Sequence, residues 1–361
     1  MKKFLKIFIV FITAITAGSL VISCFSVYID PRKFLYPAYF GLAFPIIFFL
    51  HLVLTIFWIL RRNRSLIFFT TLILIISLPW FFDVFQIDFS AKKEKKGNTI
   101  KFMTYNVRNF SLYDWKNNGK KRDFMLDFIK IEKADIICYQ EFYYERKKDF
   151  ISLDTICSIQ ETPFYHIYNS NTISSSNNFG QATFSKYPIV NSGEITFSFS
   201  NNSCIFTDVL INTDTIRVYN NHLESIRFMQ EEYNLIDSIA IKFEEEEYLG
   251  MVKKLSTAYK FRAREVDEIS THIKNCTYPV IVCGDFNDTP ISYAYRKMKG
   301  DLYDAFKKSG AGIGATYNGN IPFQRIDYIL YSRDFDSWNY TTGEIEYSDH
   351  YPVICLLELN K

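Results

Sequence analysis

Three long stretches without a charged residue dominate the first 90 residues of this 361-residue chain. No Asp, Glu, Lys or Arg occurs in residues 7–29, 34–60 or 65–82. One helical span of a bilayer core needs about 20 consecutive apolar residues. The runs also lack the polar stripe of a helix that packs on a soluble core. The sequence therefore predicts a membrane anchor of three transmembrane helices over residues 1–90, in preference to a buried core.

The start of the first run supports a second interpretation of the anchor. Lys2 and Lys3 precede an apolar stretch that ends in residues 21–24 (VISC), and this order resembles a signal peptide with a lipoprotein cleavage site. Cleavage before Cys24 would leave two spans. Because the apolar stretch continues past Cys24, three spans are preferred.

Basic residues predict the orientation of the anchor, because they favour the cytoplasmic side of a membrane. Lys2, Lys3, Lys6 and the loop 61–64 (RRNR) fall on one side of a three-span anchor. The larger, C-terminal part of the chain then lies on the other side. Four lysines in the charged linker 91–98 favour the opposite orientation. On balance we expect a multi-pass membrane protein whose larger part is extracytoplasmic.

The charge of the C-terminal part differs from that of the whole chain. Residues 97–361 hold 29 of the 41 basic and 35 of the 39 acidic residues, a net charge of −6, although the whole chain has +2. Nonspecific nucleic-acid binders usually expose a basic surface, so the balance counts against DNA as the obvious substrate. The seven cysteines form no Cys-x-x-Cys pair, so no zinc site is predicted.

Residues 99–361 alternate between strand-like and helix-like patterns. Helices are predicted within residues 121–133 and 231–275, and a polar Ser/Asn-rich loop at 169–178. Strands are predicted at residues 99–105, 134–139, 164–168, 182–185, 195–198, 204–210, 215–220, 279–283, 325–330 and 353–358. Strands outnumber helices, which fall between groups of strands. This order predicts an α/β (α+β) four-layer sandwich, with two packed, mainly antiparallel sheets flanked by helices.

Four short polar strings each close an apolar run: residues 105–108 (YNVR), 140–141 (QE), 284–288 (GDFND) and 348–350 (SDH). Any one of them could be an ordinary turn or strand end. Proteins of the α/β type tend to place chemistry at the carboxyl ends of strands. The joint occurrence of the four strings therefore predicts one site with carboxylates, amides and a histidine, a set suited to metal-assisted attack of water on a phosphate ester.

The chain has only five histidines, and two of them lie in such strings. His222 lies within residues 219–225 (YNNHLES), and His350 follows Asp349. The other three are predicted to have no catalytic role: His51 lies in a predicted span, His166 in a strand and His272 in a helical stretch at the surface.

Together, these strings resemble the motifs of the endonuclease/exonuclease/phosphatase superfamily over residues 99–358. Further similar strings are residues 180–188 (GQATFSKYP), 220–223 (NNHL) and 325–328 (RIDY). The superfamily includes DNase-like nucleases, abasic-site endonucleases, neutral sphingomyelinases and inositol polyphosphate phosphatases. The resemblance implies a catalytic domain over residues 99–361 that hydrolyses a phosphodiester or phosphomonoester, and it leaves the substrate open.

The resemblance also implies a metal site and substrate contacts. Asn106, Glu141 and Asp349 would hold or surround Mg²⁺ or Mn²⁺, hard cations that prefer oxygen ligands. The metal would polarise a phosphoryl oxygen and offset developing charge. Asn220 and Arg325 would bind the substrate.

Five further residues are implied as catalytic. Asp285 would orient or deprotonate the attacking water, and Asn287 would contact the scissile phosphate. His222 would donate a hydrogen bond to a phosphate oxygen. Asp327 would fix the orientation of His350.

The substrate could be a phospholipid headgroup, a nucleotide or nucleic acid. Residues 142–144 (FYY) follow Glu141 where abasic-site endonucleases carry Thr-Lys, which disfavours a repair nuclease. The loop 169–178 and the insertion 231–260 are expected to border the site and to select the substrate. The bilayer, through residues 1–90, is the one further partner implied, and no protein partner is.

Two other functions remain open. A membrane-tethered binding module with the same fold would be expected to have lost metal-site or histidine positions, yet none is missing. A transporter or channel built on residues 1–90 would be expected to carry charged residues inside its spans, which the three runs lack.

Overall fold

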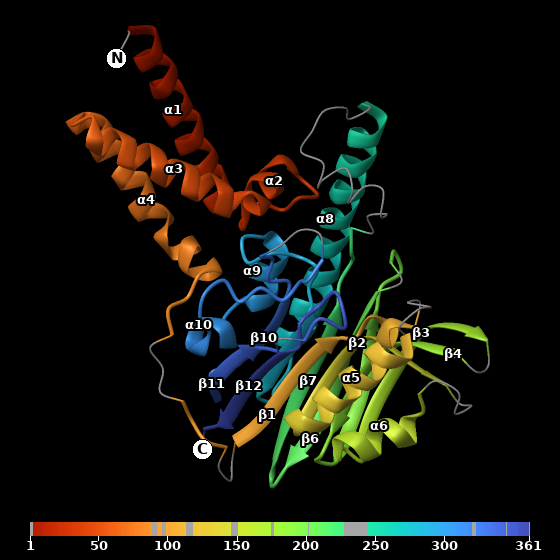
Figure 1. The fold of residues 1–361 in the computed structure, drawn as a ribbon. Coiled ribbons are helices and arrows are strands. Elements are labelled where there is room, and N and C mark those ends of the chain that lie inside the picture. Colours follow the sequence, from red (N-terminus) through yellow and green to blue (C-terminus); the bar gives the residue numbers. More distant parts are fainter. Residues whose placement is uncertain are drawn as a thin grey trace.

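A computed structural model describes residues 3–88, 92–95, 99–112, 118–145, 151–174, 177–200, 202–226, 245–319, 323–343 and 345–360. An N-terminal group of apolar helices is followed by a two-sheet sandwich (Figure 1). Two predicted segments lie partly outside the described residues: the linker, at residues 91 and 96–98, and the insertion, at residues 231–244.

The N-terminal group contains the helices α1 (Lys3–Ser26), α2 (Tyr36–Leu42), α3 (Phe44–Leu60) and α4 (Arg64–Val84). Among the described residues, α1 and α4 are each long and apolar enough to cross a membrane. The pair α2 and α3 is bent by 69° and would make a third crossing if it counts as one span. These helices coincide with the three predicted apolar runs.

Buried polar side chains connect the helices of this group. Thr16 Oγ1 lies 3.2 Å from His51 Nδ1, and His51 Nε2 lies 3.3 Å from the carbonyl oxygen of Thr70. The indole of Trp58 donates to Thr13 Oγ1 at 3.0 Å. Such hydrogen bonds hold α1, α3 and α4 together where apolar packing alone is unspecific. His51 is therefore structural, as its sequence position suggests.

The sandwich contains two six-stranded sheets of the same design. The first has the order β11-β12-β1-β2-β4-β3 and the second β5-β6-β7-β8-β10-β9. Neighbours are antiparallel except for one central pair in each sheet, β1 with β2 and β7 with β8. The prediction of mainly antiparallel sheets is confirmed.

The strands of the first sheet are β1 (Thr99–Asn106), β2 (Ile136–Glu145), β3 (Phe164–Ser174), β4 (Asn177–Ser185), β11 (Phe335–Thr342) and β12 (Val353–Leu359). Those of the second are β5 (Ile189–Thr196), β6 (Ser203–Ile211), β7 (Asp214–His222), β8 (Val280–Asp285), β9 (Tyr303–Asp304) and β10 (Asp327–Tyr331).

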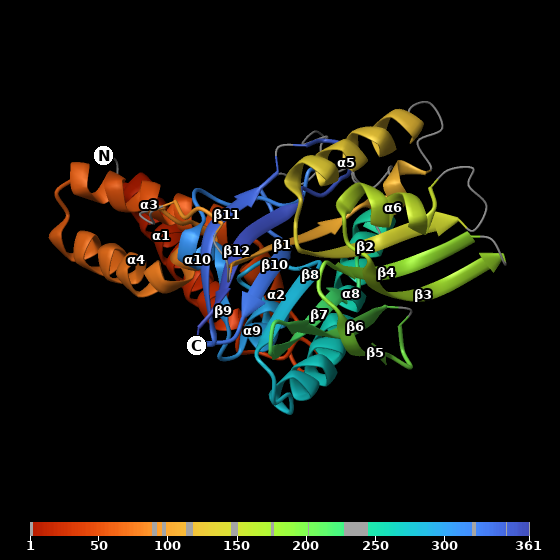
Figure 2. The same cartoon turned by 90° about the horizontal axis from the view of Figure 1, so that it is seen from below.

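Helices cover the outer face of each sheet, which confirms the four layers (Figures 1 and 2). On the first sheet lie α5 (Asn118–Glu132) and α6 (Leu153–Gln160), and on the second α8 (Glu245–Lys274) and α9 (Tyr293–Lys299). The short helices η1 (Arg108–Ser111) and α10 (Ala305–Ser309) follow β1 and β9.

Alternate residues of the central strands serve two different cores. In β8, Ile281 and Cys283 face the first sheet, whereas Val280 and Val282 pack under the helices of the second. A strand that is buried on both faces needs apolar residues throughout. This requirement explains the uninterrupted apolar run before the polar string at 284–288.

The structure corrects one prediction outside the site. Strands β3 and β4 include residues 169–174 and 177–178 of the predicted loop, because they pair with each other and β4 pairs with the far end of β2. Pairing with neighbouring strands here overrides the polar composition. Residues 245–274 of the predicted helical stretch 231–275 form one helix, α8, and residues 231–244 lie outside the described part of the chain, so the prediction of two helices stays untested.

The four N-terminal helices, which correspond to the predicted membrane anchor and are called the anchor below, pack directly against the sandwich. Gln86, just after α4, exchanges two backbone hydrogen bonds with Gly312, of 2.9 and 2.8 Å. The side chain of Arg32, between α1 and α2, lies 2.5 Å from that of Asp267 on α8. Ile291, from the loop after β8, is buried in a cluster with Leu20 and Phe44 of the anchor. The two parts therefore share an apolar contact close to the string 284–288.

Candidate active site

The parallel strand pairs bring four of the predicted strings to one edge of the sandwich. In the first sheet Asn106 pairs with Gln140, at the ends of β1 and β2. In the second sheet His222 pairs with Asp285, at the ends of β7 and β8. Parallel neighbours end on the same side of a sheet. The symmetric placing of these two pairs therefore gathers amide, imidazole and carboxylate groups between the sheets.

Gly284 allows β8 to approach β7 closely enough for this arrangement. Its φ is 117°, which side chains of L residues rarely adopt. A Cβ atom at this position would lie 2.1 Å from the backbone oxygen of Asn221. Glycine is thus required immediately before Asp285.

Asp285 lies at the centre of the site and is only 1% exposed. Its Oδ2 accepts a hydrogen bond of 3.0 Å from Asn106 Nδ2, and its Oδ1 accepts one of 2.8 Å from the backbone N–H of Asn287. Burial, partly offset by the charges of His350 and His222, raises the pKa of Asp285 to about 6. The carboxylate is therefore a stronger base than an exposed aspartate, yet it is mostly ionised at neutral pH.

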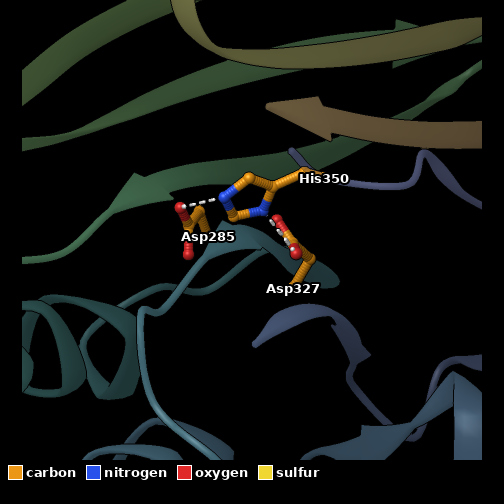
Figure 3. Close-up of side chains that lie close together, drawn as sticks. All are labelled: Asp285, Asp327 and His350. Carbon is orange, nitrogen blue, oxygen red and sulfur yellow. Dashed lines mark hydrogen bonds and ion pairs between the residues drawn. The ribbon is translucent and has the colours of Figure 1, made fainter. Parts of the chain in front are cut away.

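His350 lies between two aspartates (Figure 3). Its Nδ1 is 2.9 Å from Asp327 Oδ2, and its Nε2 is 3.6 Å from Asp285 Oδ2. Burial lowers the pKa of His350, but the charges of Asp327 and Asp285 outweigh this effect, and the pKa lies well above its ordinary value. The two carboxylates thus favour the protonated form of the ring, which Asp327 holds. The backbone N–H of Asp327 in turn donates to Thr316 Oγ1 at 3.0 Å.

His222 faces both sheets from the end of β7. Its Nε2 lies 3.7 Å from Glu141 Oε1 and 3.9 Å from Asp285 Oδ2. Its side chain is 22% exposed, so it can reach a bound substrate. The imidazole therefore stands between the predicted metal ligand and the predicted base.

Three oxygen-bearing side chains of the predicted metal site lie beside this group. Glu141 occupies an irregular point of the β2–β4 pairing, with φ of 48°, and its Oε1 is 3.4 Å from Asn106 Nδ2. Asp349 is 3.4 Å from Arg108 Nε. Burial and the nearby charge of Asp349 raise the pKa of Glu141. An oxygen-rich group with excess negative charge fits a hard cation such as Mg²⁺ or Mn²⁺.

Asp285, Asp327 and His350 form a second group that could hold a metal, with one ligand atom from each within 4.8 Å of the others. A metal ligand, however, has to be a neutral imidazole nitrogen. Here Nδ1 of His350 is engaged with Asp327, and the neighbouring carboxylates favour the protonated ring. In this form His350 is hydrogen-bonded to Asp327 and ion-paired with Asp285, and a metal would have to replace the proton on Nε2.

Asn287 turns its side chain back toward the end of β7. It adopts a φ of 52°, and its Nδ2 donates to the carbonyl oxygen of Leu223 at 2.9 Å. An amide nitrogen carries two N–H donors. The second donor of Asn287 is thus available to a phosphate oxygen, as its predicted role requires.

Asn220 does not reach the site surface. It is completely buried, and its Nδ2 donates to the carbonyl oxygens of Tyr139 and Ala182 at 3.1 and 3.0 Å. It lies two residues before His222, on the same face of β7 but one step deeper between the sheets. This position corrects the expectation of a substrate contact, since Asn220 connects the two sheets.

Arg325 is buried where the N-terminal helices meet the sandwich. Its Nη1 is 2.8 Å from Asp304 Oδ2, and its Nη2 donates to the carbonyl oxygen of Asp83 at 2.9 Å. Only 2% of the residue is exposed. Two nitrogens of the guanidinium are thus engaged by the sandwich and by the end of α4, and the expectation that Arg325 binds the substrate stays a prediction.

Two charged residues of α8 position the site and were not predicted. Arg262 Nε is 3.1 Å from Asp288 Oδ2, and Glu265 accepts a 2.9 Å hydrogen bond from the backbone N–H of Glu224. Both are buried, with 1% and 0% exposed. They hold the segments just after Asp285 and His222. The signal in the sequence was their spacing, because both fall in phase with the apolar residues of the helix.

A four-layer sandwich with amide, acidic and imidazole side chains at the ends of its central strands defines the class of protein. The sequence profile of the endonuclease/exonuclease/phosphatase family matches residues 103–350. The chain belongs to this family. A second profile, for a domain of unknown function (DUF8431), matches residues 5–83. No curated protein matches the chain.

Solved structures of the same family have a similar fold. The protein from Bacteroides vulgatus is 18% identical with a TM-score of 0.53, over 73% of this chain and 100% of that one. The protein from Beutenbergia cavernae is 15% identical with a TM-score of 0.52, over 73% and 72%. The human Nocturnin catalytic domain with bound sulfate is 15% identical with a TM-score of 0.51, over 74% and 97%. At these identities the likeness concerns the fold alone.

Proposed function

We propose that this chain is a membrane-anchored, divalent-metal-dependent phosphoester hydrolase. The observation that carries the proposal is the environment of Asp285. This buried carboxylate has a pKa of about 6, accepts a hydrogen bond from Asn106, and lies within 4 Å of the imidazoles of His222 and His350. In a member of a phosphoesterase family, such a group is suited to activate water.

The metal site belongs to the same proposal. Glu141, Asn106 and Asp349 would hold Mg²⁺ or Mn²⁺, which would polarise a phosphoryl oxygen and neutralise charge. A cation at this position would stabilise the charged form of Glu141, whose pKa is raised by burial and by the nearby carboxylate of Asp349.

The remaining residues have roles that follow from their contacts. Asp285 orients the attacking water and accepts its proton. Attack on the phosphate adds negative charge to the phosphoryl oxygens, and preorganised donors stabilise such charge strongly in a dry site. The imidazolium of His350, the Nε2 of His222 and the free N–H of Asn287 are those donors. Asp327 keeps the ring of His350 charged and correctly oriented.

The arrangement of the anchor supports an extracytoplasmic catalytic domain. In Figures 1 and 2 the start of α1 and the turn between α3 and α4 lie at the end of the anchor that is far from the sandwich. Lys3, Lys6 and the arginines of residues 61–64 belong to these segments. Basic residues favour the cytoplasmic side, so the sandwich would lie on the opposite side.

The lysines of the linker, which favour the reverse orientation, are partly neutralised by the sandwich. Lys93 forms an ion pair with Glu358, and Lys95 Nζ lies 2.7 Å from Asp135. Their charges are thus compensated by the folded domain, which weakens their effect on orientation.

An activity panel tests the proposal. The purified full-length protein would be assayed with Mg²⁺ or Mn²⁺ on a nitrophenyl phosphodiester, a phosphomonoester, a phospholipid and an oligonucleotide. At least one should be hydrolysed, and Asp285→Asn should lower kcat by about two orders of magnitude or more. Asp301→Asn, at the exposed turn before β9, is the matched control. Silence on every substrate would instead favour a non-catalytic binding module, and full activity of Asp285→Asn would refute the assigned site.

A further inference from the structure

A cavity of about 610 Å³ lies where the anchor meets the sandwich. Its walls come from α2, α3 and α4 on one side, and from residues 289–291, Ile313 and residues 323–325 on the other. Cavities that hold a small ligand usually measure about 300–1,000 Å³. The lining is almost entirely apolar, with many phenylalanines, so the cavity suits a hydrocarbon better than a sugar or a base.

The cavity is open toward the surface that the anchor presents to a bilayer. Ile46 and Phe49 on α3 line it, and they are 74% and 55% exposed. In a helix long and apolar enough to approach a membrane, exposed apolar residues face lipid. A lipid chain can therefore enter the cavity from the bilayer without crossing water.

Two buried polar atoms belong to residues of the cavity wall. Within the described part of the chain, Thr289 Oγ1 and Arg325 Nε have no hydrogen-bond partner, although both atoms are buried. The other two nitrogens of Arg325 are engaged with Asp304 and Asp83. A buried donor without a partner is costly, so each such atom calls for an acceptor. A ligand with an oxygen beside its hydrocarbon chain would satisfy both.

The same wall is continuous with the catalytic strings. Thr289 follows Asn287 by two residues, and Arg325 precedes Asp327 by two. Consecutive Cα atoms are about 3.8 Å apart, so each wall residue lies within roughly 8 Å of a site residue along the backbone. A molecule whose chain fills the cavity can therefore have its polar end near the reacting groups.

We propose that this junction cavity binds the hydrocarbon chain of a membrane lipid, and that the substrate is a phosphoester carrying such a chain. The inference rests on the proposed function and names its substrate class. The chain fills the cavity, an ester oxygen accepts hydrogen bonds from Arg325 Nε and Thr289 Oγ1, and the phosphate extends toward Asn287. Nucleotides and nucleic acids have no group that would fill this volume.

Photocrosslinking in lipid nanodiscs tests chain binding without knowledge of the headgroup. The full-length protein would be reconstituted with phosphatidylcholine that carries a diazirine in its acyl chain, and the labelled peptides mapped by mass spectrometry. Label is expected on the peptides containing Thr289 and Ile313, because both belong to the sandwich. Label confined to the outer faces of the anchor helices would overturn the inference.

Bulky substitutions test whether the label reports the cavity. Ala43→Trp and Ile313→Trp fill it from opposite walls and should lower labelling of the Thr289 peptide at least fivefold. Val53→Trp is the matched control, because Val53 lies on the exposed face of α3 and is 61% exposed. Equal labelling in the three variants would overturn the inference.

Hydrolysis assays on several substrates test this inference and the proposed function separately. A chain-free nitrophenyl phosphodiester would be compared with long-chain and dihexanoyl phospholipids of the same headgroups, and with a single-stranded oligonucleotide. The ratio of kcat/KM for long-chain lipid to that for the chain-free diester should fall at least tenfold in Ile313→Trp and not in Val53→Trp. Cleavage of the chain-free diester or the oligonucleotide without any preference for a long chain would overturn the inference alone. No cleavage of any ester would overturn the proposed function as well.

Discussion

Two aspartates flank His350 and have different tasks because their surroundings differ. Asp327 lies 2.9 Å from Nδ1 and serves as the partner that keeps the ring charged. Asp285 lies 3.6 Å from Nε2, is held by Asn106, and has a pKa raised to about 6. Two carboxylates in different surroundings commonly divide the work of a hydrolytic site. The acid–base assignment thus depends on burial and partners, not on residue type.

The pKa of Asp285 predicts the pH dependence of hydrolysis. Protonation removes the base, so kcat/KM should fall as the pH drops through about 6. In His350→Gln the neighbouring positive charge is lost, which raises the pKa of Asp285, so the residual activity should fall at a higher pH. A bound cation lowers the pH at which activity falls in both proteins, but the variant should still lose activity at the higher pH. If the activity of His350→Gln falls at the same pH as that of the wild type, or at a lower pH, the assignment is contradicted.

The residue-level site could be predicted from the sequence only in part. Asp285 and His222 were recognisable because each closes a strand within a string of polar residues, and His350 because it lies in such a string just before β12. The depth of a side chain in the sandwich could not be recognised from the sequence. Asn220, two positions from His222, connects the sheets instead of facing the substrate. The ion pair of Arg325 could not be predicted, because its partner Asp304 lies 21 positions away in another element.

At the scale of the elements, the ends of two parallel strand pairs build the site and α8 secures the segments that follow them. The apolar runs that predicted these strands also predicted the edge at which they end. The contribution of α8 was hidden by its Glu/Lys-rich composition, which is typical of a solvated helix. Its inner face nonetheless buries Arg262 and Glu265 beside Asp288 and Glu224.

Gly284 tests the close approach of β7 and β8. Gly284→Ala should destabilise the protein by about 2–4 kcal/mol, because the new Cβ meets backbone of Asn221 and the positive φ is strained. Gly250→Ala in α8 is the matched control, since no atom lies within 4 Å of its added Cβ and alanine favours a helix. Thermal unfolding of the two variants measures the difference. A similar effect of both substitutions would contradict the argument.

The buried contacts that α8 makes with the segments after Asp285 and His222 should affect both stability and turnover. Arg262→Met leaves Asp288 buried without its partner, which typically costs about 3–5 kcal/mol, and it frees the segment after Asp285. Unfolding should therefore occur at a lower temperature and kcat should fall. Adding Asp288→Asn should recover part of the stability, because the uncompensated charge is removed. Arg264→Met, at an exposed position on the same helix, should change neither the unfolding temperature nor kcat. An equal loss in Arg264→Met would argue against a specific role of the Arg262–Asp288 contact.

At the scale of the whole molecule, the anchor and the sandwich form one packed unit. Ile291 is buried among anchor side chains only four residues after Asn287, and Gln86 pairs with Gly312. The catalytic edge is thereby kept at a fixed place relative to the apolar helices. Three apolar runs could be recognised in the sequence. Their packing against the loop after β8 could not be predicted, because it depends on contacts between distant residues.

The proposed orientation predicts which positions are accessible from outside the cell. In right-side-out vesicles, a membrane-impermeant maleimide should label Asp301→Cys, at the exposed turn before β9. It should label Asn63→Cys, at the turn between α3 and α4, only after permeabilisation. The native cysteines are buried or half-buried and give the background. Labelling of Asn63→Cys in intact vesicles, with Asp301→Cys protected, would reverse the topology.

The most direct test of the account is the dependence of hydrolysis on metal concentration in the wild type and in Glu141→Gln. Activity of the full-length protein should vanish with a chelator and return with Mg²⁺ or Mn²⁺. Glu141→Gln should need at least tenfold more metal and retain a small fraction of the rate, because a charged oxygen ligand is lost. Glu194→Gln, at an exposed position on β5, should behave like the wild type. Full hydrolysis in the chelator, or an unchanged metal requirement in Glu141→Gln, would contradict a metal-dependent site built on Glu141 and Asp285.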